Sequence, residues 1–168
     1  MLRDKNLIPL SHQHQHALAL CVRIDRGLSA DQTDVAAWCD EVAKIWSDEI
    51  SVHFQAEEDV LFPEAKKYAD LSLLVGELLA EHQSLRKCFS RASAHRLNAP
   101  GLRTMAAELS AHIRKEERLL FEECQRLMSP ERLRELGAKL EQALSAAVHQ
   151  CSLPNPALNA KSKIKKSP

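Results

Sequence analysis

The stretch SVHFQAEEDVLF at residues 51–62 decides the fold, because it returns as SAHIRKEERLLF at residues 110–121. Both copies read S-x-H-x-x-x-E-E-x-x-L-F. In an α-helix, residues four positions apart lie on one face, about 6 Å apart along the axis. Each copy therefore presents an imidazole and a carboxylate in one direction. The two pairs are His53 with Glu57, and His112 with Glu116. Pairs that face each other predict a metal site.

Apolar residues on either side of these copies recur at alternating steps of three and four, which is the pattern of core-facing helices. The expected helices cover residues 9–28, 32–62, 71–94 and 102–127. Pro63 is expected to kink or stop the second one. Ser129 and Pro130 have the residue types of a helix cap and first turn, so a fifth helix is expected to run to about residue 149.

Length and charge limit the classes of function. The chain has 168 residues, enough for one domain with a full hydrophobic core. Basic and acidic residues number 23 each, so no net charge draws the chain to nucleic acid or to a membrane surface. No apolar run approaches the roughly 20 residues that span a bilayer. We therefore expect neither a nucleic-acid nor a membrane partner, and the residues identify no protein partner.

The cysteines and the N-terminus indicate the compartment. Five cysteines are scattered without a C-x-x-C pair, which is typical of a reducing environment, and we expect them to fill the core. The first residues lack the apolar segment of a signal peptide. These features predict a cytoplasmic protein. We expect one helical domain over residues 1–150 and a disordered basic tail over residues 151–168, where prolines and lysines gather.

In each of the first four expected helices, the core-facing stripe of apolar residues also carries a histidine near the middle. Two of these stripes add a glutamate one turn later. The residues are His14, His53, Glu57, His82, His112 and Glu116. Polar groups on an apolar stripe destabilise the fold unless they have partners. Several at one depth can satisfy each other by sharing metal ions, as in four-helix bundles that hold two iron or manganese ions. Imidazole with carboxylate suits iron, manganese or zinc better than copper(I) or calcium.

Some assignments stay open at this point. His12 or His16 is the alternative to His14, because all three lie on one short stretch. Glu58 and Glu117 directly follow the two glutamates, and we expect them at the surface, with a role as acceptors beside the ligands as the alternative. Glu81 precedes His82 and is likewise expected to be exposed, although it could orient a neighbouring ring.

The chain resembles the hemerythrin-like HHE cation-binding family over most of residues 7–125. The resemblance rests on four segments: Gln13 with His14, HFQAEEDVLFP at residues 53–63, EHQSL at residues 81–85 and HIRKEERLLF at residues 112–121. It implies an all-α fold, an up-down four-helix bundle here followed by an additional C-terminal helix. It also implies a centre of two non-haem iron ions, with zinc or manganese as alternatives. The implied metal ligands are His14, His53, Glu57, His82, His112 and Glu116, the two glutamates bridging.

The sequence departs from the oxygen-carrying hemerythrins, which have two histidines four positions apart on the third helix. Here neither Leu78 nor Arg86 supplies the second imidazole. Those proteins also place an aspartate five residues after the last histidine, whereas here Glu116 stands at four and Glu117 at five. The chain is more similar to the wider bacterial and regulatory members, whose roles include iron or oxygen sensing and the handling of nitric oxide or peroxide.

The sequence analysis leaves three hypotheses for the function. The first is a di-iron protein that binds or senses dioxygen, nitric oxide, peroxide or iron itself. The second is a di-iron enzyme that reduces one of those small molecules. The third is a metal-free helical interaction module, in which the histidines and glutamates bond to each other or face solvent. The residues favour binding or sensing over catalysis. No nucleophile triad and no phosphate-binding glycine loop is evident, which argues against chemistry on large organic substrates.

Overall fold

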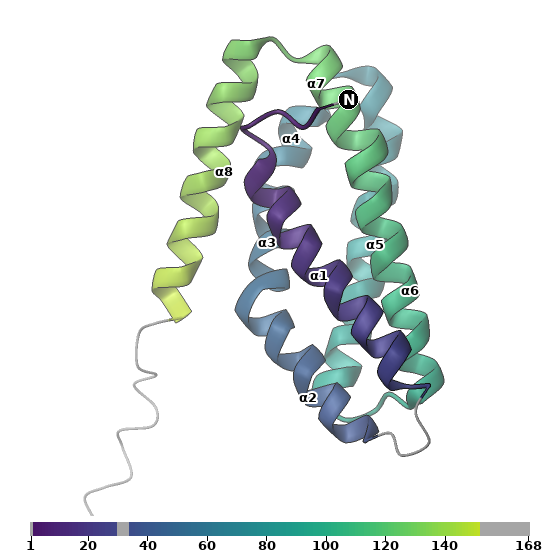
Figure 1. The fold of residues 1–168 in the computed structure, drawn as a ribbon. Helices are drawn as coiled ribbons and strands as arrows, with labels where there is room; N and C mark the ends of the chain where they lie inside the picture. The colour runs from purple at the N-terminus through teal and green to yellow at the C-terminus, as the bar shows by residue number, and fades with distance from the viewer. Residues whose placement is uncertain (1, 30–33, 152–168) are drawn as a thin grey trace, which may run out of the picture.

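The computed structural model of the chain describes residues 2–29 and 34–151, with side chains up to residue 145. Within these residues the chain forms helices and no strand, as the sequence predicts. Four long helices run alternately down and up to form a bundle, and a fifth helix stands along one side of it (Figure 1). The first helix packs against the fourth, and the second packs against the third.

The boundaries of the elements lie close to the expected ones. The first and third long helices are α1 (Ile8–Gly27) and α5 (Ala69–Ser93). The second is continuous through α2 (Val35–Ile45), η1 (Trp46–Ile50), α3 (Ser51–Ala56), η2 (Glu57–Leu61) and α4 (Phe62–Ala65). The fourth runs through α6 (Ala99–Lys115), η3 (Glu116–Leu120) and α7 (Phe121–Leu127), and α8 (Pro130–Cys151) is the fifth. The expected start at residue 32 and the expected tail beyond Cys151 lie outside the described residues.

Side chains directly before three of the observed helices cap their first turns. The Asp34 carboxylate accepts a hydrogen bond from the Ala37 amide, and the Asn98 side chain accepts one from the Gly101 amide. The Ser129 hydroxyl accepts one from the Arg132 amide at 3.3 Å, so the predicted cap of the fifth helix is confirmed. Such caps satisfy amides that have no partner within the helix.

Pro63 is expected from the sequence to kink or stop the second helix near residue 62; it does not stop it there, because the helix continues three residues further, to Ala65. Pro63 stands in the first turn of α4, directly after the π-helical segment η2. The missing N–H and fixed φ of proline are tolerated in a first helical turn. The change of hydrogen-bond register at the end of η2 gives Pro63 such a position inside a continuous helix.

Two π-helical segments, η2 and η3, begin at the glutamates of the repeated motif. In each segment a backbone amide reaches five residues back: Phe62 bonds to the Glu57 carbonyl, and Phe121 bonds to the Glu116 carbonyl. The added residue brings each glutamate and the phenylalanine five positions later into the buried interior. π-turns inside α-helices are frequent at functional sites, and these two occupy the same place in both copies.

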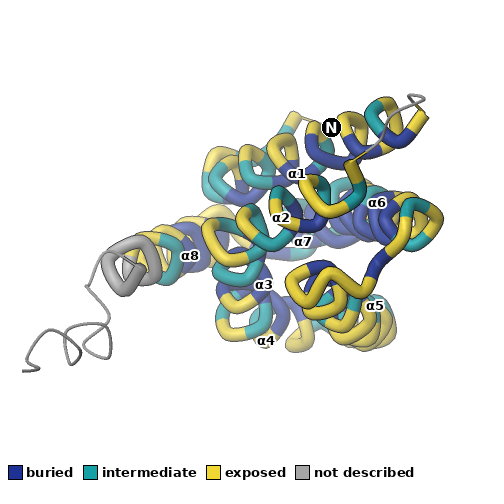
Figure 2. The backbone as a smooth tube through the Cα atoms, turned by 90° about the horizontal axis from the view of Figure 1, so that it is seen from below, coloured by how far each residue is buried: buried dark blue, intermediate teal, exposed yellow. Residues whose placement is uncertain are grey.

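The hydrophobic core consists of two clusters with the six predicted site residues between them along the bundle. One cluster lies toward the α1–α2 connection and includes Ile24, Phe89 and Leu102. The other lies toward the opposite end and includes Leu10, Phe62 and Phe121. Figure 2, which views the bundle from below, shows buried residues facing its interior and exposed ones facing outward. The buried polar layer is therefore enclosed on both sides by apolar packing.

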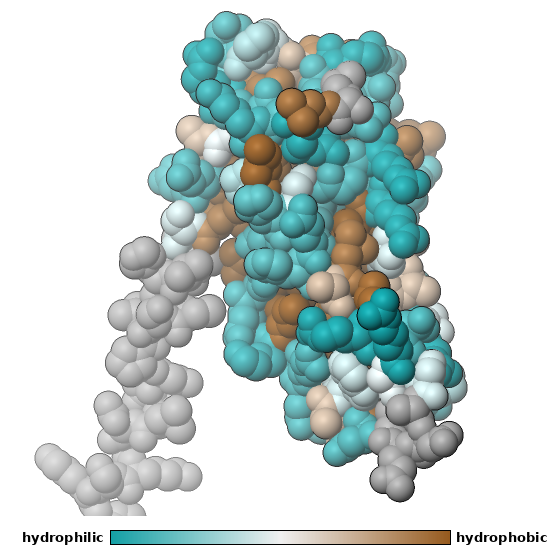
Figure 3. Space-filling model, in the orientation of Figure 1, coloured by the Kyte–Doolittle hydropathy of each residue, from teal (hydrophilic) through white to brown (hydrophobic). Residues whose placement is uncertain are grey.

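The helix α8 covers the second of these clusters, to which it contributes Leu133, Leu136 and Leu140. Polar side chains cover most of the molecular face shown in Figure 3, and hydrophobic ones show there as separate patches. Within the described residues no helix has the length and apolar character to cross a bilayer. Of the cysteines, Cys21, Cys39 and Cys124 are buried as expected, and Cys88 is half-buried; all four are free thiols.

Candidate metal centre

The structure brings all six predicted site residues together in the middle of the bundle. α1 supplies His14, α3 supplies His53, and α5 and α6 supply His82 and His112. Glu57 and Glu116 begin η2 and η3. All six side chains are buried, and both glutamates are 0% exposed. These six residues form two adjoining groups that share the glutamates, and each group has the donor types of a metal site.

The first group, here called the first position, is His14, His53, Glu57 and Glu116, with one ligand atom of each residue within 4.8 Å of the others. The two imidazole Nε2 atoms are 2.9 Å apart. Nε2 of His53 lies 3.3 Å from Oε1 of Glu57, and Nε2 of His14 lies 3.2 Å from Oε2 of Glu116. Four donor atoms therefore converge on one point.

The second group, the second position, is Glu57, His82, His112 and Glu116, and its geometry matches the first. The Nε2 atoms of His82 and His112 are 3.0 Å apart. Nε2 of His82 lies 3.4 Å from Oε2 of Glu57, and Nε2 of His112 lies 3.4 Å from Oε2 of Glu116. Glu57 thus directs one oxygen to each position, which is the arrangement of a bridging carboxylate.

The carboxylate oxygens at these positions lack the hydrogen bonds that a metal-free core would need. All four oxygens of Glu57 and Glu116 are buried without a hydrogen bond in the protein. Two ionised carboxylates with oxygens within 4.8 Å repel each other by about 3 kcal/mol at an effective dielectric constant near 20. Buried charges of one sign require a cation. The residues therefore fit a pair of metal ions, one at each position.

The outward nitrogen of each histidine is held by an acceptor side chain. Nδ1 of His14 bonds to Glu117 at 2.7 Å, and Nδ1 of His53 bonds to Gln13 at 2.8 Å. The remaining two contacts, each at 2.8 Å, join His82 to Glu58 and His112 to Glu81. With a proton on Nδ1, each Nε2 carries its lone pair toward the centre. Such contacts fix the tautomer and the orientation of metal-binding imidazoles.

Each of the three outer carboxylates has a cation on its far side. Arg3 contacts Glu117 at 2.6 Å, Arg86 binds Glu58 with both terminal nitrogens, and Lys115 contacts Glu81 at 2.5 Å. These pairs hold the carboxylates in place against the histidines. The hydrogen bond from His112 lowers the pKa of Glu81 to about 2, against burial and with help from Lys115. Burial would raise the pKa of Glu117, but the bond from His14 outweighs it and, with a smaller effect of Arg3, lowers that pKa to about 2.

Two phenylalanines of the repeated motif region pack flat against histidines. Phe54 stacks on His82 with ring centroids 3.7 Å apart, and Phe121 stacks on His14 at 5.5 Å. Arg86 lies over the Phe54 ring and Arg3 lies over the Phe121 ring. Arg86 therefore holds His82 in two ways, by packing on Phe54 at the face of the imidazole and by binding Glu58 at its edge. Arg3 holds His14 in the same two ways, through Phe121 and Glu117.

Electrostatics in the absence of a metal favour protons at the site. Burial alone lowers the pKa of His14, but the adjacent Glu116 and Glu117 outweigh it and raise the pKa to about 10. Burial likewise opposes a raised pKa at His112, where the charge of Glu116 and the bond to Glu81 prevail. Burial would raise the pKa of Glu57, yet His53 and His82 hold it well below its usual range.

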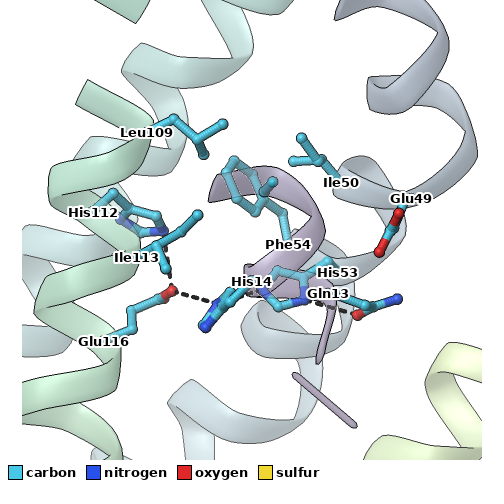
Figure 4. A pocket seen from close by; sticks show the side chains of 11 residues that line it. Gln13, His14, Glu49, Ile50, His53, Phe54, Leu109, His112, Ile113 and Glu116 are labelled. Atoms are coloured by element: carbon cyan, nitrogen blue, oxygen red, sulfur yellow. Dashed lines mark hydrogen bonds and ion pairs between the residues drawn. The ribbon is translucent and has the colours of Figure 1, made fainter. Parts of the chain in front are cut away.

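A small cavity adjoins the first position and also reaches His112 of the second. Its volume is about 10 Å³, enough for a molecule of about the size of water. His14, His53 and Glu116 lie on one side, apolar side chains such as Phe54 and Ile113 line another, and Gln13 and Glu49 stand at the edge (Figure 4). The cavity can therefore hold a molecule about the size of water, whereas an organic substrate would require the helices to move.

The structure decides the assignments that the sequence left open. His14 lies in the site, while His12 is exposed and the exposed His16 bonds to Glu49. Glu58, Glu81 and Glu117 are not surface acids, contrary to the favoured expectation, because they accept hydrogen bonds from site histidines. The role of Gln13 was missed. Its signal was its place directly before His14, which matches the place of Glu81 before His82.

Comparison with known families agrees with the geometry of the site. A family model described as the hemerythrin HHE cation binding domain matches residues 9–124, which is more than half of the chain. The matched residues contain all six buried site residues and the π-helical segments η2 and η3. Neither the curated proteins nor the solved structures include a match. The chain belongs to the hemerythrin family, as a member with an HHE cation-binding domain.

Proposed function

We propose that this protein holds two non-haem iron ions, one at each position, and binds or senses a small molecule there. The observation that carries the proposal is the convergence of four imidazole nitrogens and four unpartnered carboxylate oxygens on two adjoining points. Imidazole and carboxylate ligands in this arrangement are typical of di-iron helical bundles, and zinc or manganese is the alternative. A metal-free module would leave those oxygens buried without partners.

The chain provides binding, orientation and exclusion of water around the ions. Two histidines and the two shared glutamates would hold an ion at each position, and a reduced iron pair, when bound, would supply electrons to a small molecule. The small cavity beside His14 and His53 supports dioxygen, nitric oxide or peroxide as that molecule. Phe54 and Ile113 limit access of water. We also propose that the protein works in the reducing cytoplasm, where its free cysteines stay reduced.

Metal analysis after aerobic purification tests the iron centre. We expect close to two irons per chain, and loss of most of the metal in His53→Ala and in His112→Ala, because each removes a buried donor. His12→Ala is the matched control, since this exposed histidine lies outside the site. Full metal content in both site variants, or an iron-free protein that also takes up no iron when reconstituted, would contradict the proposal.

Rapid mixing separates a binding protein from an enzyme. The reduced protein is mixed with dioxygen, nitric oxide or peroxide, and the visible spectrum is followed with time. A stable adduct that reverses when the small molecule is removed is the result we expect. Repeated consumption of the small molecule in the presence of a reductant would instead support a di-iron enzyme.

A further inference from the structure

The bundle repeats not only the motif but also the contacts around it. The second glutamate of each motif copy holds a histidine of another helix: Glu58 holds His82 on α5, and Glu117 holds His14 on α1. In sequence, QHQ at residues 13–15 on α1 corresponds to EHQ at residues 81–83 on α5. Both the ligands and the acceptors around them therefore come in two equivalent sets.

The motif histidines are held by the residue that precedes the histidine on α1 or α5. Gln13 accepts from His53, and Glu81 accepts from His112, with 2.8 Å between the heavy atoms in both cases. The two contacts have the same length, and they connect equivalent histidines of the repeat. They differ in charge alone, because one acceptor is an amide and the other a carboxylate.

The residues around the two acceptors match their difference in charge. Glu81 is neutralised by Lys115, which stands three residues after His112. The equivalent position three residues after His53 is Ala56, a buried residue that carries no charge. An amide at residue 13 needs no cation, so the absence of a lysine at residue 56 fits a neutral Gln13. The repeat thus differs at two linked places on one side of the centre.

An amide is a weaker acceptor than a carboxylate, and this difference passes to the metal through the imidazole. A carboxylate on Nδ1 raises the basicity of Nε2 and so strengthens its bond to a cation, and loss of such a contact typically weakens metal binding about 10–100-fold. Both histidines of the second position have a carboxylate. At the first position His14 has one, and His53 has only the amide of Gln13.

We propose that Gln13 makes the two metal positions unequal, so that the second position fills first and the first position, beside the cavity, holds its ion more weakly. Gln13 acts through His53 and is a positioning residue. This inference rests on the proposed function, because it assumes that both positions take a metal. A weakly held ion beside the cavity makes the first position the one that exchanges or responds to the metal supply.

Titration of the metal-free protein with Co²⁺ tests the inference, followed by visible absorption and by calorimetry. For the wild type we expect two steps. Glu81→Gln should weaken the first step about 10–100-fold, and Gln13→Glu should strengthen the second by a similar factor. Each single variant therefore brings the two steps together. The variant with both substitutions should separate them again, because the carboxylate and the amide have changed places.

Repulsion between the two bound ions also separates the two binding steps. It acts in all variants, so it does not predict that the single variants bring the steps together and the double variant separates them again. Gln15→Glu is the matched control, because it adds the same charge two residues away at an exposed position of α1 and should change neither step. Circular dichroism checks that each variant remains helical. If two ions bind and neither substitution at residues 13 and 81 moves its step, this inference alone is overturned. If no Co²⁺ binds, the proposed metal centre is overturned with it.

Discussion

At the scale of single residues, the two ring nitrogens of each buried histidine have different roles. Nε2 faces the centre, and Nδ1 is bound to an acceptor 2.7–2.8 Å away. The acceptors are bound in turn by Arg3, Arg86 and Lys115, except for Gln13. The ligand set is therefore fixed by contacts that reach from the centre to the surface of the bundle.

Glu117 tests the importance of these contacts. Glu117→Gln keeps the shape of the side chain but replaces the carboxylate that holds His14 and Arg3. We expect metal affinity to fall about 10–100-fold, as is typical when an outer partner of a metal ligand is lost. Glu123→Gln is the control, since Glu123 pairs with Arg126 outside the site. Competition with a chelator of known affinity measures both, and equal affinities would show that the contact has no such role.

The pKa of His14 predicts that metal binding releases protons. In the metal-free protein this pKa is raised to about 10, so the imidazole stays charged at about pH 8, where an unfolded chain would leave it neutral. Its contribution to folding is complete below the unfolded pKa of about 6.5 and is lost as the pH rises toward about 10.

A bound metal requires the neutral imidazole, so affinity should rise with pH over this range, by up to tenfold per unit for each proton displaced. Calorimetry in two buffers with different enthalpies of ionisation, at about pH 8, should show release of at least one proton per chain. The same measurement above about pH 10 should show release of less, and a proton count near zero at both pH values would contradict the raised pKa.

At the scale of elements, the π-helical segments η2 and η3 and the helix α8 set the environment of the centre. η2 and η3 begin at Glu57 and Glu116, and each is followed by a buried phenylalanine, Phe62 or Phe121. Because each π-helical segment adds one residue, the glutamate faces the centre and the phenylalanine five positions later faces the apolar cluster. The helix remains continuous between them. The polar layer and the hydrophobic cluster next to it are thus joined within one helix.

Packing of α8 closes the apolar cluster on one side of the centre, and Leu140 on this helix is 0% exposed. Leu140→Ala should lower the free energy of unfolding of the metal-free protein by about 2–5 kcal/mol, because it removes buried methyl groups and leaves a cavity. Leu73→Ala, at a side chain that is 78% exposed, should change it by less than about 0.5 kcal/mol. Urea unfolding measures both, and equal effects would show that α8 contributes no packing.

At the scale of the whole molecule, the core is divided into two apolar clusters by a layer of six ionisable groups. Without a metal, the oxygens of two carboxylates lie at the centre of the bundle without a hydrogen bond, beside the charged His14. Metal binding to the folded state should therefore stabilise the entire chain. Ions present at roughly 100 times their dissociation constant add about 2.7 kcal/mol per site.

Removal of the metal tests this coupling between site and fold. Treatment with a chelator should lower Tm by about 5–10 °C for each site emptied, and added metal should restore it. The variant that combines His53→Ala with His112→Ala serves as the control and should show little response to either treatment. Calorimetric or spectroscopic melting measures the shift, and an identical response in wild type and variant would place the effect outside the site.

The amino-acid sequence by itself determined the helical class, the approximate helix boundaries and the six inward residues. Apolar residues at steps of three and four mark the buried face of each helix, and polar residues on that face can be recognised from their spacing. It also favoured His14 over its neighbours, since His12 and His16 lie off the stripe. Only the tertiary structure decided the roles of Glu58, Glu81, Glu117 and Gln13, which stand beside the stripe and are given partners by other helices. The same holds for the π-helical segments, because a bond to the fifth residue back has no residue preference that the sequence shows. Periodicity records which face of a helix is buried, whereas the identity of the contact across the bundle depends on how helices distant in sequence pack together.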